Sequence, residues 1–230
     1  MARTDETAPK TGTAPQVAGM LEEEIVLGLR FPHQRLVEDE LMARFAAKRH
    51  VVRRALQDLE NDGLVERRPH VGAFVRAYTA KEVRDIYAVR ELLETACARG
   101  IPLPVPAERL AELVAIQRRH DTAVDSDDLR GIMHSNTAFH RALFALSEND
   151  ALVAAILRHA QMTHAIRSVN AGSRPVQDQA RREHWAMIHA LEECDPEALA
   201  ETCRQHLLPS RDAYLRRVET LAPDTASARR

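Results

Sequence analysis

The stretch from Glu38 to Val75 decides the fold of the first part of the chain: EDELMARFAAKRHVVRRALQDLENDGLVERRPHVGAFV. Apolar residues recur in it at helical spacing on both sides of a small-residue break at Ala46-Ala47, which predicts two short helices. The second helix is expected to end at Asn61-Asp62-Gly63, because these residues tolerate the left-handed backbone that closes a helix. Two short helices joined by a tight turn form a helix-turn-helix.

A β-hairpin is predicted directly after these helices. Residues 64–67 and 73–76 alternate apolar and polar side chains as strands do, and the residues between them, Arg68-Pro69-His70-Val71-Gly72, are typical of a turn. A hairpin in this position is the wing of a winged helix-turn-helix.

Basic residues gather in the same stretch. Between Arg44 and Arg76 there are eight basic residues against four acidic ones, although the whole chain has a net charge of -2. Several of them lie at the start of the second helix, the end that a recognition helix places in the major groove. Arginine can pair there with guanine edges or phosphates, and a solvated basic face would not explain the arginines of the adjoining wing. We therefore predict DNA contacts from Arg35, Glu38, Lys48, Arg49, His50, Arg53, Arg54 and Gly72.

The same residues carry a resemblance to a known family. The segments Glu38 to Leu41, Lys48 to Leu56, Gly63 to Val65 and Gly72 to Val75 resemble the winged helix-turn-helix of GntR-type bacterial transcription regulators. Arg49 and Arg53 match the two arginines of the family pattern Ser-Arg-Thr-Pro-Val-Arg-Glu-Ala-Leu, while Lys48, His50, Val51 and Arg54 replace serine, threonine, proline and glutamate. These replacements are expected to affect the preferred operator more than the fold.

A further departure from the family lies before the recognition unit. Members usually have Pro-Gly where this chain has Pro32-His33, so we expect His33 to adopt a strained, positive φ.

Composition indicates two ordinary domains. The chain has 230 residues, of which 45% are hydrophobic and 29% charged, enough for two cores. We expect a disordered tail over residues 1–16, the DNA-binding domain over 17–77, a helical domain over 80–218 and a flexible tail over 219–230. No apolar run is long enough for a signal peptide or a membrane span. Three widely spaced cysteines without a C-x-x-C pair favour buried thiols in a reduced, cytoplasmic setting.

From Ala80 onward the sequence predicts helices only. The extended break at residues 101–106 contains three prolines, which remove backbone donors and disfavour helix in the residues before them. Six helices in about 140 residues form a compact bundle. The predicted fold is therefore mainly α, a winged helix-turn-helix followed by an all-α bundle, with expected helices over 80–99, 107–124, 126–146, 150–169, 175–193 and 196–218.

Three histidines of this bundle are expected to converge. His184 lies eleven residues before Asp195 and His206 eleven residues after it, so an antiparallel pair of helices that turns at Asp195 would bring both to one depth. His140 lies less than three helical turns before the loop at residues 147–150 that ends its helix. Neutral imidazoles suit zinc, nickel and similar ions. On spacing alone, the cluster is either a metal site or a hydrogen-bonded polar core.

A second resemblance concerns these histidines. Asn136-x-x-x-His140, Glu183-His184 and Gln205-His206-Leu207 resemble the metal-binding version of the FCD effector domain, found in the FadR branch of GntR regulators. The resemblance implies a divalent metal, zinc or nickel, on Asn136, His140, His184 and His206. The family normally has aspartate at the position of Asn136, so this chain should hold the metal less tightly and its site should be more cationic by one unit.

Two residues are expected to bind an effector. Residues 87–94, YAVRELLE, resemble the first helix of that domain, whose arginine points into the cavity beside the metal. Arg90 is therefore expected to hold a carboxylate in bidentate geometry, unless it pairs with Glu94 one turn away. Asn170 is a second candidate.

We interpret the chain as a homodimeric, cytoplasmic regulator that binds operator DNA and responds to a small organic acid. The resemblance implies a repressor. Two recognition units related by a two-fold axis read half-sites about one DNA turn apart, which multiplies specificity. No catalytic residues are expected, and no membrane partner. The alternatives are a metalloenzyme, in which the histidines activate water, and a metal sensor; Glu183 is expected to point about 100° away from His184, leaving no general base nearby.

Overall fold

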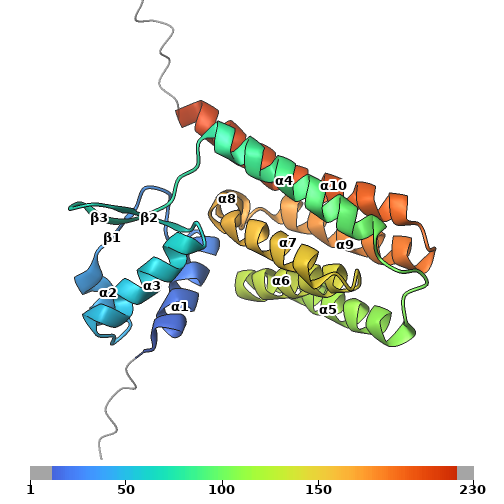
Figure 1. Ribbon diagram of the computed structural model, residues 1–230, viewed down its shortest axis with the longest axis horizontal. Helices are drawn as coiled ribbons and strands as arrows, with labels where there is room; N and C mark the ends of the chain where they lie inside the picture. The colour runs from blue at the N-terminus through green and yellow to red at the C-terminus, as the bar shows by residue number, and fades with distance from the viewer. Residues whose placement is uncertain (1–11, 222–230) are drawn as a thin grey trace, which may run out of the picture. The chain divides into compact units, whose positions relative to one another are not determined.

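The computed structural model describes residues 12–221 of the chain (Figure 1). The chain divides into two compact units, one of residues 12–25 and 29–76 and the other of residues 26–28 and 77–221. Residues 1–11 of the expected N-terminal tail and 222–230 of the expected C-terminal tail lie outside the described residues.

The first unit combines helices with a small sheet. Its elements are α1 (Ala14–Val26), β1 (Arg35–Leu36), α2 (Glu38–Arg44), α3 (Arg49–Asn61), β2 (Val65–Arg68) and β3 (Gly72–Val75). The strands lie in the order β1-β3-β2, and both pairings are antiparallel. This is a winged helix-turn-helix, as predicted, with the wing strands shifted by one residue from their expected bounds.

Helix α3 is amphipathic. Val52, Ala55, Leu56 and Leu59 are buried on one face, while the basic residues at its start are exposed. The apolar spacing that predicted the helix is therefore the face that packs, and the charged face remains available for a ligand.

Three turns of this unit hold non-glycine residues at positive φ. Ala46, in the break between α2 and α3, has φ +46°, His70, in the hairpin turn, has φ +62°, and His33 has φ +68°. The conformation predicted for His33 is thus confirmed, since the Pro32-His33 turn keeps the left-handed backbone that glycine adopts more easily.

Helix α1 begins earlier than predicted. It starts at Ala14 rather than Val17, so the expected tail of residues 1–16 is wrong for its last residues. The side-chain oxygen of Gln16 accepts hydrogen bonds from the backbone N–H and the hydroxyl of Thr13, and Pro15 suits the first turn. Both features start the helix before its apolar face begins.

The second unit is a helical bundle. Its elements are α4 (Ala80–Arg99), α5 (Ala107–Asp125), α6 (Leu129–Ala145), α7 (Asp150–Met162), α8 (His164–Arg167), the 3-10 turn η1 (Ser168–Asn170), α9 (Arg174–Glu192) and α10 (Pro196–Leu221). Figure 1 shows α4 and α10 running antiparallel along each other. No described helix is both long and apolar enough to cross a membrane.

Helix starts in the bundle follow local sequence signals. Thr79 and Glu82 form a reciprocal capping box at the start of α4. Asp195 accepts hydrogen bonds from the backbone of Glu197 and Ala198, and Pro196 is the first residue of α10. Both helices begin where the sequence predicted, at residues 80 and 196.

The expected helix over residues 150–169 is interrupted. Helix α7 ends at Met162, and α8 and η1 follow as separate short turns. At the break, the Thr163 hydroxyl lies 2.7 Å from the Ala160 carbonyl oxygen and 3.1 Å from an Arg90 nitrogen. The interruption matters for function, because it directs Arg167 and Asn170 toward the interior of the bundle. Helix α10 also continues past the expected end at Val218, so the first residues of the expected flexible tail over 219–230 are helical.

The bundle core lies between α4, α5, α6, α7, α9 and α10. Phe139 and Leu143 of α6 and Met187 of α9 are fully buried in it. Cys97 and Cys203 are also buried, as expected, but Cys194 is exposed in the turn before α10. The expectation of buried thiols is therefore wrong for Cys194, which lies at φ +55° in a surface turn.

Candidate functional site

The residues predicted to contact DNA gather in the first unit. Lys48 is the N-cap of α3, and Arg49, His50, Arg53 and Arg54 occupy its first turns with exposed side chains. The first turn of α3 contains no acidic residue, so its backbone amide groups and its cations present one positive end.

Ion pairs to α2 hold two of these arginines. Arg49 lies 2.6 Å from Asp39 and 3.5 Å from Glu38, and the Nε of Arg53 lies 3.0 Å from Glu38. Glu38, predicted to contact DNA, thus contacts the arginines of the recognition helix. Arg54 pairs instead with Asp58 on its own helix. The carboxylates of α2 restrict where the guanidinium groups of α3 can point.

The wing carries the other two predicted residues. An Nη of Arg35 donates a hydrogen bond to the Val71 carbonyl, at 3.0 Å. Gly72 has φ +124°, a conformation that side chains disfavour. These two residues shape the hairpin turn, and the exposed cations Arg67 and Arg68 lie on the strand before it.

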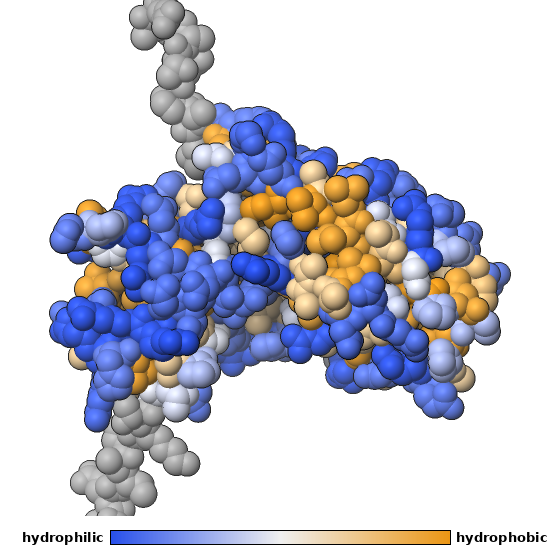
Figure 2. Space-filling view, in the orientation of Figure 1, coloured by the Kyte–Doolittle hydropathy of each residue, from blue (hydrophilic) through white to orange (hydrophobic). Residues whose placement is uncertain are grey.

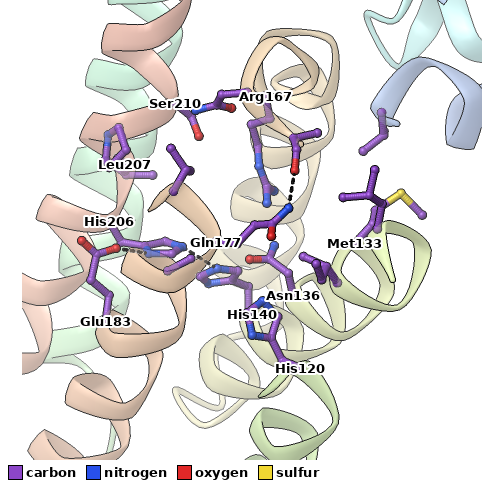
Figure 3. A pocket seen from close by; sticks show the side chains of 18 of the residues that line it. His120, Met133, Asn136, His140, Arg167, Gln177, Glu183, His206, Leu207 and Ser210 are labelled. Carbon is purple, nitrogen blue, oxygen red and sulfur yellow. Dashed lines mark hydrogen bonds and ion pairs between the residues drawn. The ribbon is translucent and has the colours of Figure 1, made fainter. Parts of the chain in front are cut away.

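A cavity lies within the helical bundle (Figure 3). It offers about 110 Å³ to the centres of water-sized molecules, room for several waters or a small organic molecule. All predicted effector and metal residues except His184 line it, and its polar lining includes Arg90, His120, Asn136, His140, Arg167, Asn170, Gln177, Glu183, His206 and Ser210.

Three histidines from three helices meet at this cavity. One ring nitrogen of each of His140, His184 and His206 lies within 4.8 Å of the corresponding nitrogens of the other two. The Nε2 atoms of His140 and His206 are 3.1 Å apart. The convergence predicted from the spacing around Asp195 is therefore present.

Neighbouring side chains orient two of the imidazoles. The Nδ1 of His184 lies 2.8 Å from the side-chain oxygen of Gln117, and the Nδ1 of His206 lies 2.6 Å from a carboxylate oxygen of Glu183. Each Nδ1 therefore carries the proton, which leaves the lone pair on Nε2, the arrangement seen around metal-bound imidazoles.

Burial keeps the rings of His184 and His140 neutral. His184 is fully buried, and burial together with the neighbouring histidine His206 holds the pKa of His184 and of His140 well below the usual range. Burial acts against the charged form of Glu183, but the hydrogen bonds with His206 and Gln179 and the nearby positive charges together outweigh it and lower the pKa of Glu183. The site thus presents two neutral imidazoles, His140 and His184, beside one carboxylate, and neutral imidazole is the form that binds metal.

The cluster fits a divalent ion. Two imidazole nitrogens bound to one zinc ion at about 2.0–2.1 Å lie roughly 2.9–3.4 Å apart for bond angles near 90–110°, and the separation between His140 and His206 falls in that range. The Nε2 of His184 is buried and has no hydrogen-bond partner among residues 12–221. An unsatisfied buried acceptor is costly, and a metal ion would satisfy it.

Asn136, the predicted fourth ligand, is buried one helical turn before His140. Figure 3 shows both side chains entering the cavity. The amide nitrogen of Asn136 has no hydrogen-bond partner among the described residues. It can therefore donate a hydrogen bond to a ligand in the cavity.

Arg90 and Arg167 differ in their ion pairing. Arg90 lies 2.8 Å from Glu94 and both side chains are buried, so the predicted effector residue Arg90 lines the cavity but has its charge paired. Among residues 12–221, no carboxylate forms an ion pair with Arg167. Burial, and then the nearby Arg90, lowers the pKa of Arg167. Asn170 lines the cavity with a buried amide nitrogen that lacks a partner.

Comparison with known proteins assigns both units. The model for bacterial regulatory proteins of the gntR family matches residues 13–75, and the FCD domain model matches residues 85–208. The chain belongs to the GntR family. It is a transcription regulator with an N-terminal DNA-binding domain and a C-terminal FCD domain.

Relatives of this GntR regulator cover most of its length. The transcriptional repressor RspR of Escherichia coli is 24% identical over 84% of each chain. A probable D-xylose utilization operon repressor of Paenarthrobacter nicotinovorans is 28% identical over 90% of each chain. Among solved structures, a putative GntR regulator from Rhodococcus sp. RHA1 matches with a TM-score of 0.73 at 24% identity, covering 88% of this chain and 97% of that one.

Another solved structure, McbR/YncC of E. coli, has a TM-score of 0.75 at 19% identity, covering 90% of this chain and 98% of that one. At this level of identity, both structures support the fold and say nothing about the ligand.

Two cavity residues were missed or misplaced by sequence reasoning about the FCD domain. His120, which is not among the predicted site residues, is buried with its ring 5.0 Å from that of His184, and burial lowers its pKa to about 4. The sequence signal that could have located His120 is Gln117, one turn earlier on α5, because the side chain of Gln117 contacts His184. Glu183, expected to point away from the site, contacts His206, because the face of α9 about 100° from His184 packs against α10.

Proposed function

We propose that this GntR regulator is a homodimer whose affinity for operator DNA changes when a small carboxylate binds beside a divalent metal in the FCD cavity. The observation that carries the proposal is the buried, unpartnered Nε2 of His184 facing two further imidazoles. A polar core without a ligand would leave that nitrogen unsatisfied.

Zinc or nickel would be held by His140, His184 and His206, with the side-chain oxygen of Asn136 as the fourth donor. A bound divalent ion would supply a localised positive charge that attracts the carboxylate of an effector. Gln117 and Glu183 would keep the imidazoles in the tautomer that binds metal.

The names of relatives support a regulatory role and indicate repression rather than activation. Two of them are called repressors, RspR and the D-xylose operon protein, so we infer that this regulator represses its operator and that an effector releases it. The D-xylose name also suggests effectors from carbohydrate breakdown, among which sugar acids carry the carboxylate that this cavity suits.

A titration separates the proposal from its alternatives. Operator affinity is measured on metal-free protein, after zinc addition, and after zinc plus small carboxylates. We expect zinc alone to change the affinity little and the carboxylates to change it strongly in the presence of zinc. A full response to zinc alone would identify a metal sensor, and turnover of an added acid or ester without any effect on DNA would support a metalloenzyme.

Dimerisation is supported by an exposed apolar surface. Figure 2 shows apolar residues gathered on the part of the helical unit formed by α4 and the helices beside it. Leu92 and Val89 of α4 are 70% and 38% exposed. Large exposed apolar residues on one helix favour a protein contact, and a second copy of the chain is the partner that a palindromic operator requires.

The substitution Leu92→Glu is expected to weaken the dimer at least tenfold, because it places a charge in an apolar interface. Sedimentation at several protein concentrations measures the effect. The matched control is Ala111→Glu, which adds the same charge on the exposed face of α5. Equal dimer stability in both variants would show that the interface lies elsewhere.

Asn136→Asp tests the fourth ligand. The new carboxylate would lie one turn before His140, so divalent metal is expected to bind about tenfold or more tightly, while the loss of one positive charge weakens carboxylate binding. Calorimetry with zinc, followed by calorimetry of the zinc-loaded protein with carboxylates, measures both. Unchanged or weaker zinc binding would mean that residue 136 is not a ligand.

A further inference from the structure

Two arginines line the FCD cavity, and they differ in whether a carboxylate neutralises them. Arg90 is neutralised by Glu94 at 2.8 Å, and its Nη1 lies 3.1 Å from the Thr163 hydroxyl. The family resemblance implied that the guanidinium of Arg90 binds the effector, but Glu94 and Thr163 already occupy it. Arg90 therefore forms an ion pair within α4 and a hydrogen bond from α4 to the break after α7.

Arg167 is in the opposite situation. It is the last residue of α8, whose Ala165 and Ile166 are buried, and its backbone N–H bonds to the Thr163 carbonyl at 2.9 Å. Figure 3 shows its side chain extending into the cavity, toward Gln177 and Asn136. Within the described part of the chain no carboxylate neutralises it. A partly buried guanidinium without a counterion is costly, and an anionic ligand would offset that cost.

A divalent ion bound by the histidine cluster would add a second region of positive charge. With asparagine at position 136, Glu183, which hydrogen-bonds His206, is the only carboxylate at the cluster among residues 12–221. A divalent ion there would keep an excess of positive charge, and Arg167 adds one more positive charge elsewhere in the same cavity. Two separate cationic points suit a ligand with two anionic groups.

We infer that the effector is a short dicarboxylate, with one carboxylate directed to the histidine cluster and the other bound by Arg167. The inference rests on the proposed function and deepens it, because it names the class of acid and the residue that selects it. The amides of Asn170 and Gln177, which also line the cavity, can donate hydrogen bonds to the same ligand.

Matched ligands make the test specific. Malonate, succinate and glutarate are each titrated calorimetrically into zinc-loaded protein beside their monoamides, which keep the length and lose one charge. We expect at least one dicarboxylate to bind the wild type about ten- to a hundredfold more tightly than its monoamide, the range expected for one charge-assisted contact.

Variants assign that preference to a residue. Arg167→Gln is expected to remove the preference, leaving dicarboxylate and monoamide with similar affinities, while Arg167→Lys keeps part of it. The control Arg158→Gln removes a charge from the exposed face of α7, outside the cavity, and should keep the full preference. Circular dichroism checks that each variant is folded.

The outcomes are distinguishable from a failure of the proposed function. If monoamides or simple monocarboxylates bind the wild type as well as the dicarboxylates do, the effector remains a carboxylate and the dicarboxylate inference is overturned. A preference that survives in Arg167→Gln would overturn the role of Arg167. Absence of binding by every acid, with zinc bound, would overturn the inference together with carboxylate control.

Discussion

Replacing Arg49 or Arg53 with alanine is expected to abolish specific operator binding while leaving the protein folded. Both guanidinium groups are at least half exposed at the start of α3, where a recognition helix meets base edges and phosphates. Each loss should cost about 1–3 kcal/mol in each half-site, so a dimer on a symmetric operator would lose roughly thirtyfold or more in affinity. Gel-shift assays on an operator selected from random DNA by the wild-type protein measure this.

The fold should survive, because the ion pairs that these arginines form with Glu38 and Asp39 are on the surface, where such pairs contribute about 0–1 kcal/mol. Arg99→Ala is the matched control: it removes the same charge and an ion pair with Glu197 from the helical unit, and should leave DNA binding unchanged. Normal operator affinity in both Arg49→Ala and Arg53→Ala, at normal helicity, would contradict the assignment of α3 as the recognition helix.

Replacing His184 or His206 with alanine is expected to remove a bound divalent metal. Each change deletes one of three converging imidazoles. Zinc would stabilise the wild type by about 2.7 kcal/mol at a free concentration one hundred times its dissociation constant, since it binds only the folded state. Elemental analysis and thermal unfolding with and without zinc should therefore show bound metal and a zinc-dependent shift in Tm for the wild type, and neither for His184→Ala or His206→Ala.

The control for this experiment is His189→Ala, which removes an exposed histidine from the same helix as His184. It should keep both the metal and the shift in Tm. Because His184 is fully buried, its loss could also destabilise the core, and the more exposed His206 then provides the cleaner test. A wild type that takes up neither zinc nor nickel on reconstitution would mean that the histidines form only a polar core.

Much of the fold could be predicted from the sequence, because its signals act over a few residues. The capping box of Thr79 and Glu82 started α4 where it was expected, and Asp195 with Pro196 started α10. The break at Thr163 could not be predicted, since Thr163 is held by a contact with Arg90, far away in the chain. Apolar spacing continues across it, so the helix pattern alone gives no reason to stop.

The candidate site divides in the same way. The sequence by itself determined that His184 and His206 lie at one depth, because equal spacing about a turn fixes their heights along two antiparallel helices. It also determined the exposed basic end of α3, because apolar periodicity alone decides which face of a helix packs.

Only the tertiary structure decided which charged groups are paired. Among residues 12–221, it left Arg167 without a carboxylate partner, brought Glu183 to His206 and buried His120. The physical reason is that pairing and burial depend on side chains that approach from other helices. Helical periodicity sets the direction of a side chain around its own axis, and the packing of the bundle sets what that side chain meets.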